Sequence, residues 1–327
     1  MASIVISVEV EAALSEGRPV VALETAVTTH GLPREPLDAA ARRALGEPWD
    51  AHRAVNLETA GLMEDVVRRA GAVPATVGVV NGRLCIGLDA AALRQLATDA
   101  GARKISIENL AHALECGHSG GTTVSATLAA CTQATPRPIR VMATGGIGGV
   151  HVGWTRRPDI SADLRQLART RVCVVCSGAK SIMDLPATVE ALETLGVPVL
   201  GYRTNCFPRF YAVGDARLTL AQRADSPEQI ARICRGHWEV LGAEGGVLAA
   251  NPVPERYALP EAELGPAVAA ANAAADAQAI TGAARTPLLL EHLRKATGGR
   301  SLLANIALLL DNARLAAEIA AAIPRDP

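Results

Sequence analysis

Residues 171–202, RVCVVCSGAKSIMDLPATVEALETLGVPVLGY, decide the fold class of this chain. The apolar run 171–176 is rich in β-branched residues and predicts a strand that is covered on both faces. Residues 186–195 carry a helical pattern, and the run 198–202 predicts a second strand. Strand, helix and strand in this order form a βαβ unit, whose crossover is expected to be right-handed.

The same alternation of short apolar runs and longer helical patterns continues along the chain. Further strands are predicted at 20–23, 75–80, 83–87, 140–143 and 246–249. Further helices are predicted at 57–70, 90–100, 122–132, 161–169, 227–241, 260–275, 288–297 and 301–323. The Asn81-Gly82 pair predicts a hairpin turn. These elements predict a layered α/β fold in one domain over residues 1–327, with an insertion at about 34–53.

Composition excludes several classes of protein. Apolar residues make up 49% of the 327 residues and charged residues 20%, which argues against disorder. Aromatic residues are only 2%, so a stacking platform for single-stranded nucleic acid is not expected. The formal net charge of −1 argues against a protein whose main ligand is a nucleic acid.

The chain also lacks the sequence signals of membrane and secreted proteins. No uninterrupted apolar run reaches the ~18 residues that a membrane span needs. Residues 1–19 carry acidic residues early and no basic region, so no secretory signal is expected. Seven cysteines, an odd number, show no second zinc-like pair beside Cys173 and Cys176. We therefore expect buried free thiols and a reducing, cytoplasmic setting.

Glu24 follows the apolar run 20–23 directly. In open α/β sheets the carboxyl ends of the strands face the ligand crevice. Because Glu24 is preceded by an apolar strand and close to Ala26, we expect partial desolvation to raise its pKa toward the range of a general acid. A salt bridge at the edge of the sheet is the alternative interpretation.

Lysine is scarce in this chain, which makes each lysine informative. Of 32 basic residues only Lys104, Lys180 and Lys295 are lysines. Lys180 lies just past the predicted strand 171–176, among small and apolar neighbours. An amine held away from water is a better nucleophile and suits a Schiff base. A lysine that binds phosphate is the alternative.

Two glycine-rich segments are candidate ligand loops. Residues 118–126, HSGGTTVSA, place glycines and hydroxyls before a predicted helix, which suits an anion, although an ordinary N-cap explains them as well. Residues 143–151, ATGGIGGVH, follow a strand but match neither the Walker A nor the dinucleotide fingerprint. His151 at the end of this loop is a candidate acid, base or structural residue.

Two carboxylates lie four residues apart in the segment 158–164, PDISADL. Asp159 and Asp163 flank Ser161, which is a plausible N-cap of the following helix. Such a pair suits Mg²⁺ or Mn²⁺ that keeps several waters, or a sugar hydroxyl. Acidic residues matched to a helix dipole are the alternative.

Nine motifs carry a resemblance over residues from about 19 to about 323. They are VALETAVTTHGLP, GAVPATVGVVNG, SGGTTVSAT, ATGGIGGVH, DISADLRQL, VVCSGAKSIMDL, GVPVLGY, ANPVPE and TGGRSLLANIALLLDNA. With these motifs the chain resembles the pseudouridine-5′-phosphate glycosidase family, which includes the indigoidine-synthase-A-like proteins. The resemblance implies a layered α/β/α fold, a homotrimer and an enzyme that breaks or forms the C–C bond between uracil C5 and C1′ of ribose 5-phosphate.

The resemblance also assigns roles to individual residues. It implies that Lys180 forms an imine with the ring-opened sugar, that Glu24 is the proton donor, and that Asp159 binds a divalent metal, typically Mn²⁺. It places substrate contacts at Lys104, Val124, Ser161, Ala162 and Asp163, and it places His151 and Asn305 at the pocket. A C-glycosidase or synthase acting on a different C-nucleotide, and a non-catalytic phosphosugar-binding protein, remain the alternative functions.

Overall fold

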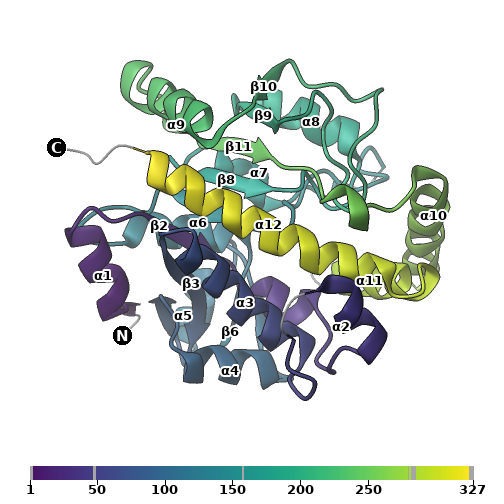
Figure 1. The fold of residues 1–327 in the computed structure, drawn as a ribbon, viewed down its shortest axis with the longest axis horizontal. Helices are drawn as coiled ribbons and strands as arrows, with labels where there is room; N and C mark the ends of the chain where they lie inside the picture. The colour runs from purple at the N-terminus through teal and green to yellow at the C-terminus, as the bar shows by residue number, and fades with distance from the viewer. Residues whose placement is uncertain (1–2, 47–48, 157, 279, 281–284, 324–327) are drawn as a thin grey trace.

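The computed structural model describes residues 3–46, 49–156, 158–278, 280 and 285–323 of the chain (Figure 1). Its strands form one mixed sheet of 11 strands among the described residues, with helices packed against it. The prediction of a layered α/β fold is confirmed. None of the described helices combines the length and the apolar character needed to cross a membrane.

The main path of the sheet follows the order β1-β4-β3-β2-β7-β8-β11-β9-β10, and β6 pairs with both β3 and β5. All pairs are parallel except those of β3 with β4 and with β6. The strands are β1 Ser3–Ile6, β2 Val20–Leu23, β3 Val73–Val80, β4 Arg83–Ile86, β5 Arg103–Ile105, β6 Gly120–Thr122, β7 Val141–Ala143, β8 Cys173–Cys176, β9 Val199–Tyr202, β10 Gln222–Ala224 and β11 Val247–Ala250. The central strands β2, β7, β8 and β11 are buried at every position, which explains their unbroken apolar sequences.

Helix α12 packs against both α3 and α9, and α6 packs with α7. The helices are α1 Val8–Ser15, α2 Ala39–Leu45, α3 Val55–Arg69, α4 Ala90–Thr98, α5 Leu110–Glu115, α6 Val124–Gln133, α7 Ala162–Leu167, α8 Leu185–Thr194, α9 Pro227–Arg235, α10 Glu261–Ala277, α11 Arg285–Ala296 and α12 Arg300–Ala322. In Figure 1 the long α12 runs across the front of the sheet, and it contacts β2, β7 and β8. Because its inner side is apolar along most of its length, α12 closes the core over the strands that carry the candidate site.

Every predicted strand and helix has a counterpart, but several boundaries were wrong. The helix predicted at 122–132 begins at Val124, because Thr122 belongs to β6. The helix predicted at 227–241 ends as α-helix at Arg235 and continues as a π-helical turn, Gly236–Val240. Strands β8 and β9 run parallel as expected, yet β11 lies between them.

The elements that the sequence did not reveal are short or polar. They are β1, β5, β6, β10, α1, α2, α5, a π-helical turn at Val27–Gly31 and a 3-10 helix at Glu255–Tyr257. The missed strands β5, β6 and β10 lack the apolar run that marks the equally short central strands, because their sequences are RKI, GGT and QRA. The hairpin prediction is confirmed, because β3 and β4 pair antiparallel across Asn81 and Gly82, whose φ angles are 49° and 73°.

The segment predicted as an insertion, 34–53, contains α2, and 34–46 and 49–53 are described. Leu37 and Leu45 are buried in the main core, and the hydroxyl of Tyr257 donates a hydrogen bond to the carbonyl of Leu45 at 3.1 Å. The segment is therefore packed into the fold. That it is an insertion relative to relatives stays a prediction.

Candidate active site

A cavity of about 290 Å³ lies where the carboxyl ends of the central strands meet the loops that follow them. All but one of the residues that sequence reasoning assigned to catalysis, substrate or metal line it. They are Glu24, Lys104, Asp159, Ser161, Ala162, Asp163 and Lys180, together with His151 and Asn305. The tertiary structure thus brings together side chains that are up to 281 positions apart in the sequence (Glu24 to Asn305, 305 − 24).

Glu24 stands at the carboxyl end of β2 and is buried. Burial raises the pKa of its carboxyl group, and the positive charge of Lys180 and a hydrogen bond from Thr144 only partly offset this effect. The Thr144 hydroxyl donates that hydrogen bond to Glu24 Oε1. Because its direct hydrogen-bond partner among the described residues is a hydroxyl, the salt-bridge interpretation is not supported. A carboxyl group that favours its neutral form can donate a proton.

Lys180 lies in the turn after β8, which is locked to the glycine-rich loop after β7. The Lys180 amide donates to the carbonyl of Ile147 at 3.1 Å, and the Ile147 amide donates to the carbonyl of Gly178 at 3.1 Å. This pair of backbone hydrogen bonds fixes where the turn places the half-buried Lys180 side chain, which lines the cavity.

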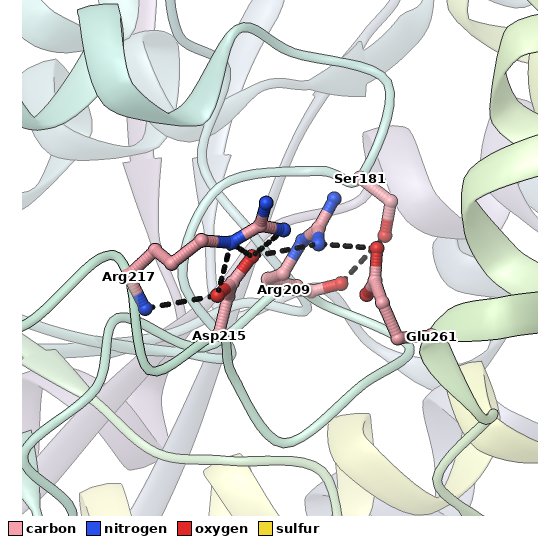
Figure 2. A network of polar contacts seen from close by, with 5 residues as sticks. All are labelled: Ser181, Arg209, Asp215, Arg217 and Glu261. Carbon is pink, nitrogen blue, oxygen red and sulfur yellow. Dashed lines mark hydrogen bonds and ion pairs between the residues drawn. The ribbon is translucent and has the colours of Figure 1, made fainter.

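A second network holds the turn from its other side (Figure 2). Ser181 Oγ donates to the carbonyl of Arg209 at 2.6 Å. The Arg209 guanidinium bridges Glu261 at 2.5 Å and Asp215 at 3.5 Å, and Arg217 pairs with Asp215 at 2.7 Å. Arg217 lowers the pKa of Asp215 to about 2, so this carboxylate stays charged throughout the neutral range. The network clamps the loop around Arg209 to the lysine turn.

Gly178 is required by the geometry of this turn, and its replacement is a test of it. Gly178 has a φ of +77°, and an added Cβ would lie 2.1 Å from the carbonyl oxygen of Pro208. We expect Gly178→Ala to lower the free energy of unfolding by about 3 kcal/mol, measured by urea denaturation. The matched control is Gly196→Ala, where φ is +67° but nothing lies within 4 Å, so only about 1 kcal/mol is expected. Equal losses for the two variants would contradict the close approach.

The carboxylate of Asp163 accepts hydrogen bonds from two backbone amides of the site. Its Oδ1 accepts from the Ser125 amide and its Oδ2 from the Gly148 amide, each at 2.9 Å. The side chain is 5% exposed. This carboxylate therefore joins the start of α6 to the glycine-rich loop, and it already takes one of the amides that a free anion would use at that helix start. Ser161 is the N-cap of α7, as predicted.

Asp159 is separate from Asp163 and pairs with a histidine instead. Its Oδ1 lies 4.0 Å from His151 Nε2, and its side chain is 40% exposed. The described residues hold no group of three or more histidine, cysteine or acidic side chains that could bind a metal. One carboxylate beside one imidazole fits a cation that keeps most of its own waters, as Mg²⁺ and Mn²⁺ often do.

Lys104 is the middle residue of the short strand β5 and lines the same cavity. Burial lowers the pKa of its amine, and the charge of Lys180 adds to this effect, while Asp163 and Glu24 oppose it. The side chain of Val124, which was expected at the substrate, is 1% exposed and belongs to the core. Its neighbours Thr123 and Ser125 line the cavity. Only the backbone of Val124 is left for a ligand, since the first turn of α6 directs its side chain inward.

Sequence reasoning missed several lining residues, among them His30, Asn109 and Phe210. It also missed Thr144, which does not line the cavity but hydrogen-bonds to Glu24. His30 lies in the π-helical turn Val27–Gly31 after Glu24, and burial lowers the pKa of its imidazole. Its proximity to Glu24 in the sequence was the available signal. Phe210 has a φ of 60° and reaches the cavity from a loop that no local pattern predicts.

Asn305 on α12 carries an unused acceptor. Its Oδ1 is buried and has no hydrogen-bond partner among the described residues. Buried polar atoms without a partner are costly, so such an atom at a cavity points to a ligand that completes the hydrogen bond.

Comparison with known proteins identifies the family. The family model of indigoidine synthase A-like proteins matches residues 51–322. The chain belongs to this family. A pseudouridine-5′-phosphate glycosidase of Methylobacterium nodulans is 49% identical to this family member over 315 residues, 96% of this chain and 86% of that protein. One of Myxococcus xanthus is 46% identical over 320 residues, 98% of each chain.

Two solved structures share the fold of this family member. The prealnumycin C-glycosynthase AlnA, in complex with ribulose 5-phosphate, is 38% identical, with a TM-score of 0.83 and coverage of 99% of this chain and 97% of that one. An indigoidine synthase A-like protein of Thermotoga maritima is 32% identical, with a TM-score of 0.81 and coverage of 98% and 96%. The prediction of an enzyme of this family is confirmed.

Proposed function

We propose that this enzyme hydrolyses pseudouridine 5′-phosphate to uracil and ribose 5-phosphate, reversibly, through an imine on Lys180. The observation that carries the proposal is the shared cavity of a buried carboxyl group, Glu24, and a turn-held lysine. The names of the relatives from Methylobacterium and Myxococcus support the substrate. The unused acceptor of Asn305 and the amine of Lys104 supply polar contacts for a phosphorylated pentose.

A C–C glycoside has no leaving-group oxygen to protonate, so two carboxyl groups alone are not enough. In the proposed sequence, Lys180 Nζ bonds to C1′ as the C1′–O4′ bond breaks, and Glu24 gives its proton to O4′. Glu24 then takes a proton from the new ammonium and delivers it to uracil C5. The nitrogen lone pair forms the C=N bond as the C1′–C5 bond breaks, and uracil leaves. Water adds to the imine carbon, and ribose 5-phosphate departs as the amine returns.

The decisive assay measures uracil release from pseudouridine 5′-phosphate by chromatography, with and without Mn²⁺. We expect stoichiometric uracil and ribose 5-phosphate, and formation of the C-nucleotide when both products are supplied in excess. No uracil from the native enzyme, while ribose 5-phosphate still binds, would favour a phosphosugar-binding protein without catalysis.

Asp159, with His151 beside it, is proposed to hold the Mn²⁺. The ion would supply positive charge to the bound substrate, while the two side chains hold it in place. We expect Asp159→Asn to raise the Mn²⁺ concentration for half-maximal uracil release by at least about tenfold, because removal of a metal ligand weakens affinity. Glu190→Gln, on the exposed side of α8, is the matched control and is expected to leave that concentration unchanged. An unchanged metal requirement in Asp159→Asn would exclude this residue as a ligand.

The second candidate function is the same reaction with a different aglycon in place of uracil. The structural neighbour AlnA is named a prealnumycin C-glycosynthase, so members of this fold join sugars to other carbon acceptors. A panel of uracil, 5-substituted uracils and other nucleobases with ribose 5-phosphate separates the candidates. Condensation with another base at a higher kcat/KM than with uracil would favour the second candidate.

A homotrimer in the cytoplasm is proposed as the working form. Val8, Val240 and Leu241 expose 76% to 83% of their surface, and association would remove such apolar groups from water. All seven cysteines are free, which suits a reducing compartment. Light scattering coupled to size-exclusion chromatography tests the stoichiometry, and a mass of one chain would contradict it.

A further inference from the structure

Asn312 on α12 joins three strand ends through one side chain. It is fully buried. Its Nδ2 donates to the carbonyl of Thr144 at 2.9 Å and to Ser177 Oγ at 3.2 Å. Its Oδ1 accepts from Asn251 Nδ2 at 2.9 Å. Thr144 follows β7, Ser177 follows β8 and Asn251 follows β11, so the amide group spans three neighbouring strands at the edge where the cavity lies.

The contacts of Asn312 lead directly to the two reacting groups. Thr144, whose carbonyl it binds, donates its hydroxyl to Glu24. Ser177, whose hydroxyl it binds, lies three residues before Lys180, and its amide donates to Gly145 at 2.9 Å. One buried amide therefore contacts both the residue that hydrogen-bonds the acid and the start of the lysine turn.

Backbone hydrogen bonds continue past the ends of the strand ladders at these residues. The Thr144 amide donates to the carbonyl of Val175 at 3.0 Å, and the Asn251 amide donates to the carbonyl of Cys176 at 2.8 Å. The side chain of Asn312 adds the contacts that tie the three strand ends to α12. A buried, fully satisfied polar network sets a single arrangement, because each unpaired group in it would cost free energy. Asn312 uses both its amide donors and its carbonyl acceptor in such a network.

We propose that Asn312, supported by Asn251, is a positioning residue that sets the geometry of Glu24 and Lys180 relative to each other. It touches neither group and acts through Thr144 and Ser177. The inference rests on the proposed function for its turnover assay, but it concerns the arrangement of the two groups and also has readouts that need no uracil. Loss of Asn312 frees the Thr144 carbonyl and loosens the hydrogen bond to Glu24.

The sign of the effect on Glu24 follows from the groups that face it. The Thr144 hydrogen bond and the charges of Lys180 and Lys104 lower the pKa of Glu24, while burial and the charge of Asp163 raise it. Weakening the Thr144 bond removes a lowering contribution, so the pKa of Glu24 rises further. The descending limb of kcat/KM on the alkaline side, where Glu24 loses its proton, therefore moves to higher pH.

The test compares Asn312→Ala with the native enzyme and with Leu192→Ala, which removes a fully buried side chain from α8 and matches the loss of stability. We expect Asn312→Ala to lose roughly 10- to 100-fold in kcat while KM stays within about twofold, because small displacements of reacting groups cost this much. In Asn312→Ala the fall of kcat/KM on the alkaline side should occur at higher pH than in the native enzyme. In Leu192→Ala it should occur at the native pH.

A second readout traps the imine with ribose 5-phosphate and borohydride, and intact-mass spectrometry follows the adduct over time. Asn312→Ala is expected to form it at least about tenfold more slowly than the native enzyme. If Asn312→Ala does not fold, Asn251→Ala keeps the two Nδ2 donors but removes the group that orients them, and a smaller change in the same direction is expected. The inference is overturned if a folded variant forms the adduct at the native rate and its kcat/KM falls at the same alkaline pH as that of the native enzyme. Native enzyme that traps ribose 5-phosphate but releases no uracil refutes the proposed substrate and leaves this inference standing on the trapping rate.

Discussion

Lys180→Ala is expected to abolish uracil release, with a loss of about 10⁴-fold or more in kcat, because the proposed mechanism forms its covalent intermediate on this amine. Lys104 lines the same cavity, but it lies on β5, outside the turn that the hydrogen bonds of Ile147 and the clamp of Arg209 hold in place. The same variant should give no adduct with ribose 5-phosphate and borohydride by intact-mass spectrometry.

Two controls separate nucleophilic attack from loss of charge. Lys180→Arg keeps a positive charge beside Glu24 but has no amine that can form an imine, so it should be as inactive as Lys180→Ala. Lys295→Ala removes a lysine that is 71% exposed on α11 and pairs with Glu291 at 3.4 Å, and it should keep native turnover. Uracil release by Lys180→Arg above a few per cent of the native rate would rule out the imine.

Glu24→Gln is expected to lower kcat by about 10²- to 10⁴-fold while leaving the binding of ribose 5-phosphate near its native affinity. Glutamine keeps the size of the side chain and can hydrogen-bond to Thr144, but it cannot pass a proton to O4′ or to uracil C5. Steady-state kinetics of uracil release and calorimetric binding of ribose 5-phosphate measure the two effects. An equal loss in binding and in kcat would assign Glu24 to substrate affinity instead.

The raised pKa of Glu24 fixes the direction of two pH effects. In the proposed mechanism the protonated form is active, so we expect kcat/KM of the native enzyme to fall as pH rises through the pKa of Glu24, and Glu24→Gln to lose this pH dependence. The pKa of this carboxyl group is higher in the folded protein than in the unfolded chain. Its full contribution to the free energy of unfolding is therefore present at pH values below the unfolded pKa. That contribution is lost as the pH rises through the folded pKa. Glu24→Gln should therefore unfold at a higher urea concentration than the native enzyme at pH 8. A variant that is both inactive and less stable at this pH would indicate structural damage.

The sequence by itself determined the layers of the fold and singled out candidate residues for the site. The apolar runs of β2, β7, β8 and β11 predicted strands because strands covered on both faces need apolar side chains at every position. Glu24 and Lys180 could be singled out because each directly follows, or lies a few residues past, such a run, and because only three lysines exist. The motifs around them carried the family, which the comparison confirmed.

Only the tertiary structure decided which polar groups are used by the protein itself and which remain for a ligand. Asp159 and Asp163 look alike in the sequence, yet Asp163 binds two backbone amides while Asp159 lies half-exposed beside His151. The family resemblance implied a substrate contact at Val124, yet its side chain is in the core. Asn312 gave no local signal, because its partners at 144, 177 and 251 meet only when β7, β8 and β11 line up beneath α12. Burial and hydrogen bonding depend on contacts between distant segments, and a local pattern of residues does not contain them.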